Sequence, residues 1–166
     1  MDLLQGGDLR YHIGLRRTFT EEQTKFFVCC MVLALEFLHK NGIIHRDIKP
    51  ENLVFDERGY LRVTDMGIAR YLKPENSQDT SGTPGYMAPE VMCRQNHGFA
   101  ADYYAVGVIV YECMFGRRPY VGRSRKEIRD QILSKQVKIR FEQVPRGWSL
   151  EAADFCNRLI QRKQVN

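Results

Sequence analysis

The residues best suited to chemistry stand together in one stretch, residues 45–52. It follows an apolar run and contains an imidazole, two cations, two carboxylates and an amide, in the order His45-Arg46-Asp47-Ile48-Lys49-Pro50-Glu51-Asn52. Because a proline cannot continue a helix, this stretch is predicted to be an ordered loop. A base, cations and oxygen ligands at this density suggest chemistry on a phosphate group.

A further carboxylate, Asp65, follows Asn52 at a distance of thirteen residues. The segment between them is predicted to be a β-hairpin, with β-prone runs at 53–55 and 60–64 and a turn at 56–59. The ends of a hairpin lie roughly 5 Å apart, so the oxygens of Asn52 and Asp65 are expected side by side. Such oxygens suit Mg²⁺, which takes one or two protein ligands plus phosphates. The alternative is that both are ordinary turn residues.

Two segments that are apolar on nearly every face predict helices in the centre of the molecule. One is 26–38, in a helix that begins after Thr20, where Thr20 and Gln23 form a capping box. The other is 103–114, with Asp102 at its start. A lone Asp in that place is usually an N-cap.

The other elements are shorter. Asp8 is predicted to cap a helix from 9 to about 15, and amphipathic helices are expected at 123–133 and 150–160. Residues 68–87 are polar and rich in hydroxyls, as in a surface loop. The fold is therefore predicted to be mainly α with a small β-hairpin.

Composition indicates one soluble globular domain, because the 166 residues are 43% hydrophobic and 27% charged. The net charge is +5, and the cations are spread along the chain, most densely at Arg117, Arg118, Arg123, Arg125, Lys126 and Arg129. That group is either a solvated face or a surface for an acidic partner. The longest apolar run, 26–35, is too short to cross a bilayer. An intracellular, cytoplasmic protein without nucleic-acid or membrane partners is expected.

The five cysteines are an odd number without paired spacing. A reducing compartment therefore fits, whereas a disulfide framework or a zinc site does not. Cys29, Cys30 and Cys113 lie inside apolar runs and are expected to be buried.

Six motifs occur in a fixed order along the chain. They are Gly6-Gly7-Asp8-Leu9, the loop 45–52, Asp65-Met66-Gly67, Gly82-Thr83-Pro84, Ala88-Pro89-Glu90, and Asp102 with Gly107. With these motifs essentially the whole chain resembles the C-terminal lobe of a eukaryotic protein kinase of the serine/threonine type. The resemblance implies one domain over 1–166, with 1–7 as hinge, 45–52 as catalytic loop and 65–90 as activation segment.

The resemblance also implies catalytic roles. Asp47 would orient the hydroxyl of a serine or threonine acceptor and take its proton, and Lys49 would neutralise charge on the transferring phosphoryl group. Asn52 and Asp65 would hold Mg²⁺ against the phosphates of ATP. Thr83, like Lys49, is typical of serine/threonine kinases.

For the nucleotide, the resemblance implies that the backbone of Asp2 and Leu4 meets the adenine. Asp8 would sit near the ribose, and Val54 would form the apolar floor under the base.

For the peptide substrate, Glu51 and Asp8 resemble positions that select basic residues upstream of the acceptor in basophilic kinases, and Thr83 is assigned to the same site. A preference for Arg or Lys upstream is the resulting hypothesis.

Regulation is implied by Arg46, which marks kinases controlled by a phosphate on the activation segment. Arg46 and Arg70 could bind such a phosphate by bidentate hydrogen bonds. The family's usual acceptor position holds Asp79. Either Asp79 is a permanent stand-in for the phosphate, or the acceptor is Thr80 or Ser81.

Structural roles are implied for four residues. His45 and Met66 would share a hydrophobic stack, in which Met66 replaces the usual Phe. Glu90 would pair with an Arg just beyond Asn166, and Asp102 is part of the motif set.

The resemblance does not extend to the N-terminal lobe of the kinase domain, which carries a Gly-rich loop, a phosphate-positioning Lys and its partner Glu. We therefore expect a fragment of a longer kinase, which by itself has little or no transferase activity. The alternative is a non-catalytic scaffold or binding module with a kinase-like surface. A small-molecule phosphotransferase is disfavoured, because it would lack the segment from Gly82-Thr83-Pro84 to Ala88-Pro89-Glu90.

Overall fold

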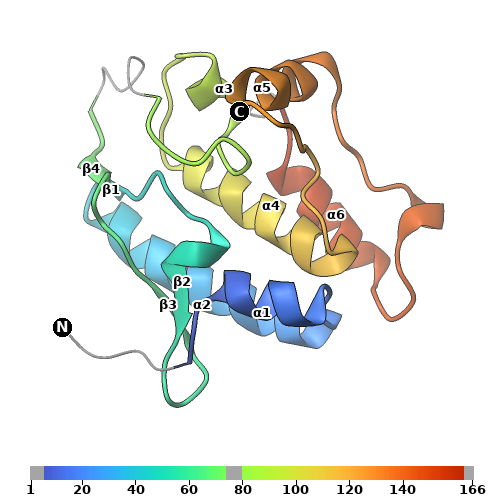
Figure 1. Ribbon diagram of the computed structural model, residues 1–166. Helices are drawn as coiled ribbons and strands as arrows, with labels where there is room; N and C mark the ends of the chain where they lie inside the picture. The colour runs from blue at the N-terminus through green and yellow to red at the C-terminus, as the bar shows by residue number, and fades with distance from the viewer. Residues whose placement is uncertain (1–5, 74–79, 163–166) are drawn as a thin grey trace.

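The computed structural model describes residues 6–73 and 80–162. The described chain is mostly helical, with two short antiparallel strand pairs at one side of the helices (Figure 1). Its elements in order are α1 Leu9–Arg16, α2 Glu21–Lys40, β1 Ile43–Ile44, the 3₁₀ turn η1 Pro50–Asn52, β2 Leu53–Phe55, β3 Leu61–Val63, β4 Arg70–Tyr71, α3 Pro89–Met92, α4 Ala100–Phe115, α5 Arg125–Ser134, the 3₁₀ turn η3 Phe141–Gln143 and α6 Leu150–Leu159. The predicted mainly α fold with a small hairpin is confirmed.

Helix α4 is the centre of the body, as its all-round apolar sequence predicted (Figure 1). Val106, Val108, Ile109 and Cys113 along it are fully buried. It ends at Gly116, whose left-handed φ of 69° is the conformation that favours glycine.

Helix α2 does not occupy the central position that the sequence predicted. The predicted capping box is present, since the Gln23 backbone N–H donates to Thr20 Oγ1 over 3.2 Å and the Thr20 N–H donates to Gln23 Oε1 over 3.1 Å. The helix packs against α4, β1 and β3 on one side only, burying Phe27 among others. On its other side Leu33 and Phe37 are 66% and 70% exposed. The central prediction was wrong because apolar residues also contribute much of a normal protein surface.

The hairpin has the predicted form. β2 and β3 pair with Leu53 opposite Val63, and Asp56 Oδ1 accepts the N–H groups of Arg58 and Tyr60 to close the turn. The chain before α1 adds to the other edge of β2, where the Gly6 N–H donates to the Phe55 carbonyl over 3.0 Å. The register of this hairpin therefore also positions the start of α1.

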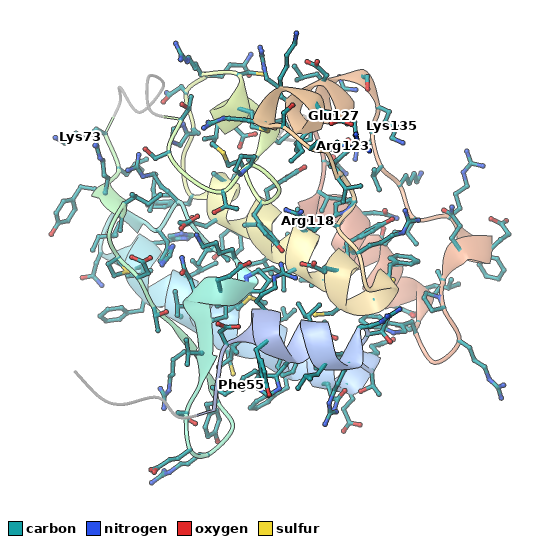
Figure 2. All side chains as sticks on the ribbon, viewed as in Figure 1. Phe55, Lys73, Arg118, Arg123, Glu127 and Lys135 are labelled. Carbon is teal, nitrogen blue, oxygen red and sulfur yellow. The ribbon has the colours of Figure 1, made fainter. Side chains whose placement is uncertain are left out.

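The side chain of Phe55, labelled in Figure 2, joins the hairpin to the helices. Its ring lies 5.0 Å from that of His12 in α1 and 5.4 Å from that of Phe27 in α2, measured between centroids. Such edge-to-face pairs stabilise beyond the area that they bury.

A second strand pair, β1 with β4, was not predicted. Ile43 pairs with Tyr71 and Ile44 with Arg70. Each strand has only two residues, too few to show a strand periodicity. The pair fastens the start of the loop 45–52 to the chain that follows Asp65.

Two cysteines are fully buried: Cys113, as expected, and Cys156, whose Sγ lies 3.4 Å from the Gly107 carbonyl oxygen of α4. The expected burial of Cys29 was wrong, because this residue lies on the outward face of α2 and is exposed. Within residues 6–73 and 80–162, no helix is both long enough and apolar enough to cross a membrane.

Candidate active site at residues 45–52

The backbone of the loop is held by a carboxylate of α4. Asp102 Oδ2 accepts the His45 N–H over 2.9 Å, and Asp102 Oδ1 accepts the Arg46 N–H over 2.8 Å. His39 Nε2 of α2 lies 2.8 Å from the same Oδ2, and Asp102 is only 1% exposed. The N-cap alternative for Asp102 was wrong, since the residue before the first turn is Phe99. Both carboxylate oxygens of Asp102 instead determine the course of the loop.

The imidazole of His45 joins the loop to the end of the hairpin. The Asp47 N–H donates to His45 Nδ1 over 3.3 Å, which assigns the ring proton to Nε2. Nε2 then donates to the Thr64 carbonyl over 3.0 Å, and the residue is fully buried. Met66, the other member of the expected stack, is 45% exposed.

Asp47, Lys49, Asn52 and Thr83 form one hydrogen-bonded cluster. Asp47 Oδ2 lies 2.7 Å from Lys49 Nζ and accepts from Asn52 Nδ2 over 3.1 Å. Thr83 Oγ1 donates to Asp47 Oδ1 over 2.8 Å and accepts from Lys49 Nζ over 3.0 Å. The side chains of Lys49 and Asp47 keep 21% and 11% of their surface exposed. The structure thus brings together residues 36 positions apart that the sequence had singled out.

The two expected metal ligands lie at the end of the hairpin. The N–H of Thr64 donates to the Asn52 carbonyl over 2.9 Å, so Asn52 faces Thr64 and Asp65 comes one residue later. The bonds of Asn52 to Asp47 turn its amide nitrogen, not its oxygen, toward Asp47. Asp65 is exposed, has a left-handed φ of 61°, and accepts the Gly67 N–H at Oδ1.

This donor set fits Mg²⁺, which takes few protein oxygens and completes its shell with phosphates and water. Among the described residues, no group of three or more His, Cys, Asp or Glu could hold a metal without such help.

The residues expected at the nucleotide are partly described. Asp8 and Val54 face one another in the strand pairing beside the hairpin. Asp8 also caps α1, as predicted, because its Oδ1 accepts the Tyr11 N–H over 2.7 Å. Asp2 and Leu4 lie outside the described residues.

The residues expected to be regulatory lie on separate parts of the chain. Arg46 Nε donates to the Ile68 carbonyl over 2.7 Å, and Arg70 is exposed in β4, opposite Ile44. A side chain at Gly82 would place its Cβ 2.9 Å from the Arg46 carbonyl oxygen, so the residues after Ser81 run close against Arg46. Asp79 lies outside the described residues.

Thr80 contacts an arginine that the resemblance did not imply. Arg125 Nη2, at the start of α5, donates to the Thr80 carbonyl over 2.6 Å. The basic cluster from Arg117 to Arg129 is therefore in contact with the segment 65–90 through Arg125.

Glu90, which was expected to pair with an Arg just beyond Asn166, lies in α3. Its backbone carbonyl accepts the Gln95 N–H over 2.8 Å.

No pattern in the sequence indicated the partner of Glu51. The guanidinium of Arg10 in α1 lies 3.0 Å from Glu51 Oε1 and also contacts Glu112 of α4. Arg10 and Glu112 are 102 residues apart, and no periodicity connects them. Both are functional candidates that sequence reasoning missed.

Comparison with known proteins assigns the chain to a family. A family model described as "Protein kinase domain" matches residues 1–166. The chain belongs to the eukaryotic protein kinase family, serine/threonine type. A protein of Caenorhabditis briggsae named "cAMP-dependent protein kinase, catalytic subunit-like" is 34% identical, over 97% of this chain and 40% of its own length.

Two further relatives match along the whole kinase chain. Ribosomal protein S6 kinase alpha-1 of Homo sapiens is 38% identical over 100% of this chain and 22% of its own length. A protein of Caenorhabditis elegans named "Putative ribosomal protein S6 kinase alpha-1" is 37% identical over 100% of this chain and 21% of its own length. The chain thus spans from about a fifth to two fifths of the length of these relatives.

Proposed function

We propose that this chain is the C-terminal lobe of a serine/threonine protein kinase whose parent protein transfers the γ-phosphoryl group of ATP to proteins. The observation that carries the proposal is the cluster of Asp47, Lys49, Asn52 and Thr83 on a loop held by Asp102. In family terms, 1–7 is the hinge, 45–52 the catalytic loop and 65–90 the activation segment.

The cluster supplies a base and a positive charge at one place. Asp47 accepts the proton of the acceptor hydroxyl, and the bonds from Asn52 and Thr83 hold its carboxylate in one orientation. Lys49, 2.7 Å from that carboxylate, provides positive charge where the transferred group gains negative charge. The low exposure of Asp47 limits the access of water.

Mg²⁺ and ATP are the cofactors that this site would take. Asn52 and Asp65 would hold the ion, while Asp8 and Val54 would lie beside the nucleoside, together with Asp2 and Leu4. When bound, Mg²⁺ neutralises the charge that develops on the phosphates.

A kinase assay tests the proposal. We expect the chain alone to have little or no activity, because its 166 residues contain no Gly-rich loop and no Lys–Glu pair of the N-terminal lobe. Joined to an N-terminal lobe, it should label serine or threonine of a protein substrate in the presence of Mg²⁺ and ATP. Asp47→Asn should lower that rate by a factor of about 100 or more.

The exposed turn variant Glu57→Gln is the control and should keep the full rate. Labelling that survives Asp47→Asn would contradict the assigned base. Substrate binding without any labelling by the joined protein would favour the scaffold alternative.

Regulation and location follow as parts of the same proposal. The parent kinase acts in the cytoplasm, and a phosphate on Thr80 or Ser81 engages Arg46 and Arg70. Loss of activity in a Thr80→Ala, Ser81→Ala double variant of the joined protein would support phosphorylation, whereas unchanged activity would favour Asp79 as a permanent substitute.

A further inference from the structure

Arg10 of α1 binds two carboxylates that come from different parts of the chain. Its Nε lies 3.0 Å from Glu51 Oε1 in η1, and its Nη1 lies 2.9 Å from Glu112 Oε1 in α4. Nη2 contacts the second oxygen of Glu112 over 3.2 Å and also the hydroxyl of Tyr86. One guanidinium therefore joins the catalytic loop, α4 and the activation segment.

The groups around this guanidinium favour a positive charge. Glu112 is 5% exposed, and Tyr86 Oη donates to its Oε2 over 2.5 Å. Burial opposes the charge of Arg10, but the contacts with Glu112, Tyr86 and Glu51 outweigh it and raise the pKa of Arg10. Burial and Glu112 raise the pKa of Tyr86, so its hydroxyl remains a donor. We call Glu51 and Glu112 the acidic pair.

The acidic pair lies next to the proposed catalytic cluster. Glu51 follows Asp47 by four residues, and Tyr86 follows Thr83 by three. The side chain of Glu51 is 43% exposed and that of Arg10 is 33% exposed, so this ion pair is accessible to solvent. Two carboxylates around one guanidinium are the arrangement with which a protein would recognise an arginine of a bound peptide.

A second arginine covers the Tyr86 ring. The guanidinium carbon of Arg118 lies 5.7 Å from the ring centroid, a cation–π distance. A Cβ at Gly85 would overlap this guanidinium, so the glycine leaves room for it. Figure 2 shows Arg118 in the middle of the molecule, between α5 and α4. Tyr86 thus has one arginine at its hydroxyl and another over its face, and neither favours a third cation there.

We propose that Arg10 permanently occupies the acidic pair and so prevents this kinase from using Glu51 to select a basic residue in its substrates. Arg10 is then a specificity-determining residue, and the proposal rests on the proposed kinase function. It replaces the basic preference that the sequence suggested for Glu51.

Peptide binding tests this proposal independently of phosphoryl transfer. The chain, joined to an N-terminal lobe, is titrated into fluorescein-labelled serine peptides that carry one arginine at each upstream position in turn, or alanine there. Fluorescence anisotropy gives the dissociation constants. The wild-type protein should bind arginine and alanine peptides within a factor of about two.

Arg10→Ala should bind one of the arginine peptides about ten times more tightly than its alanine counterpart, because the acidic pair can then bind the peptide's guanidinium. The double variant Arg10→Ala, Glu51→Gln should lose most of that gain. Arg16→Ala, in the last turn of the same helix and exposed, should behave as wild type.

If Arg10→Ala fails to fold, the single variant Glu51→Gln tests whether Glu51 selects arginine peptides. With Arg10 bound to the acidic pair, Glu51→Gln should leave the ratio of arginine-peptide to alanine-peptide affinity near one. A wild-type preference for arginine peptides of tenfold or more that Glu51→Gln removes would overturn the proposal, as would a folded Arg10→Ala protein without any gain. Failure of the kinase assay alone would instead count against the proposed function.

Discussion

At the scale of single residues, Asp102 does most to shape the candidate site. Its two oxygens accept two consecutive backbone N–H groups of the loop, from His45 and Arg46. Arg46 has a left-handed φ of 70°, which is uncommon for a residue with a side chain. The carboxylate supplies the compensating bonds that hold this conformation.

Asp102→Asn should therefore destabilise the protein. An amide has only one acceptor oxygen, so its NH₂ group would face a backbone donor in a buried place. We expect a loss of about 2–4 kcal/mol in the free energy of unfolding, measured by urea denaturation. Asp130→Asn on the exposed side of α5 is the control and should change stability by less than about 0.5 kcal/mol. Equal stability of the two variants would contradict the assigned role of Asp102.

The same residue shows which parts of the site could be predicted. Asp47, Lys49 and Asn52 were found because they stand close together in sequence, and Asp65 because a hairpin leads to it. Asp102 was mistaken for a possible cap, since its partner lies 57 residues away. Arg10 and Glu112 carry no local pattern at all, and only the tertiary structure, which brings α1 to α4, reveals their contact.

At the scale of elements, the contact between α4 and α6 depends on one small residue. A Cβ at Gly107 would lie 2.6 Å from Leu159 Cβ and 2.9 Å from Ile160 Cγ2. Cys156 Sγ lies 3.4 Å from the Gly107 carbonyl oxygen, which confirms the close approach of the two helices. The glycine is therefore explained by packing, despite its cost inside a helix.

Gly107→Ala should separate these helices. Overpacking of this kind costs about 1–3 kcal/mol, so the midpoint of thermal unfolding should fall. Gly14→Ala in α1 is the matched control, because nothing lies within 4 Å of its Cβ position. That change should raise stability by about 0.5–1 kcal/mol, since alanine is the better helix former. A Gly107→Ala protein as stable as wild type would contradict the packing explanation.

Among the elements, those with local signals were predicted well. Thr20 and Asp8 stand at helix starts where their chemistry predicted them, and the turn at 56–59 closes the hairpin. Two features failed. β1 and β4 are too short to have a pattern, and the outward face of α2 is apolar without being buried. Local sequence specifies where a helix begins more reliably than it specifies which other elements pack around that helix.

At the scale of the whole molecule, the buried core retains groups in their uncharged form. Burial raises the pKa of the Cys113 and Cys156 thiols to about 12 from an ordinary value of 9.0. Burial likewise raises the pKa of Tyr104 and of Tyr86. Each of these groups holds its proton in the folded protein at a pH where the unfolded chain has released it.

Stability should therefore fall at alkaline pH. Below about pH 9 the thiols are neutral in both states, and their full contribution is present. Between pH 9 and 12 the unfolded chain loses protons that the folded chain keeps, so the free energy of unfolding should decrease. Urea denaturation at pH 7, 9 and 10.5 measures this decrease. Cys113→Ala should show a shallower decrease, and an identical one would contradict the assignment.

The anchoring of the loop by Asp102 also has a consequence for biosynthesis. A ribosome adds about 5–20 residues per second, so residues 45–52 are made seconds before Asp102. Until the first turns of α4 have left the exit tunnel, the backbone amides of His45 and Arg46 lack their carboxylate acceptor. A nascent chain arrested just before Asp102 should thus carry every residue of the loop and none of its final shape, whereas one arrested well beyond Phe115 can complete it.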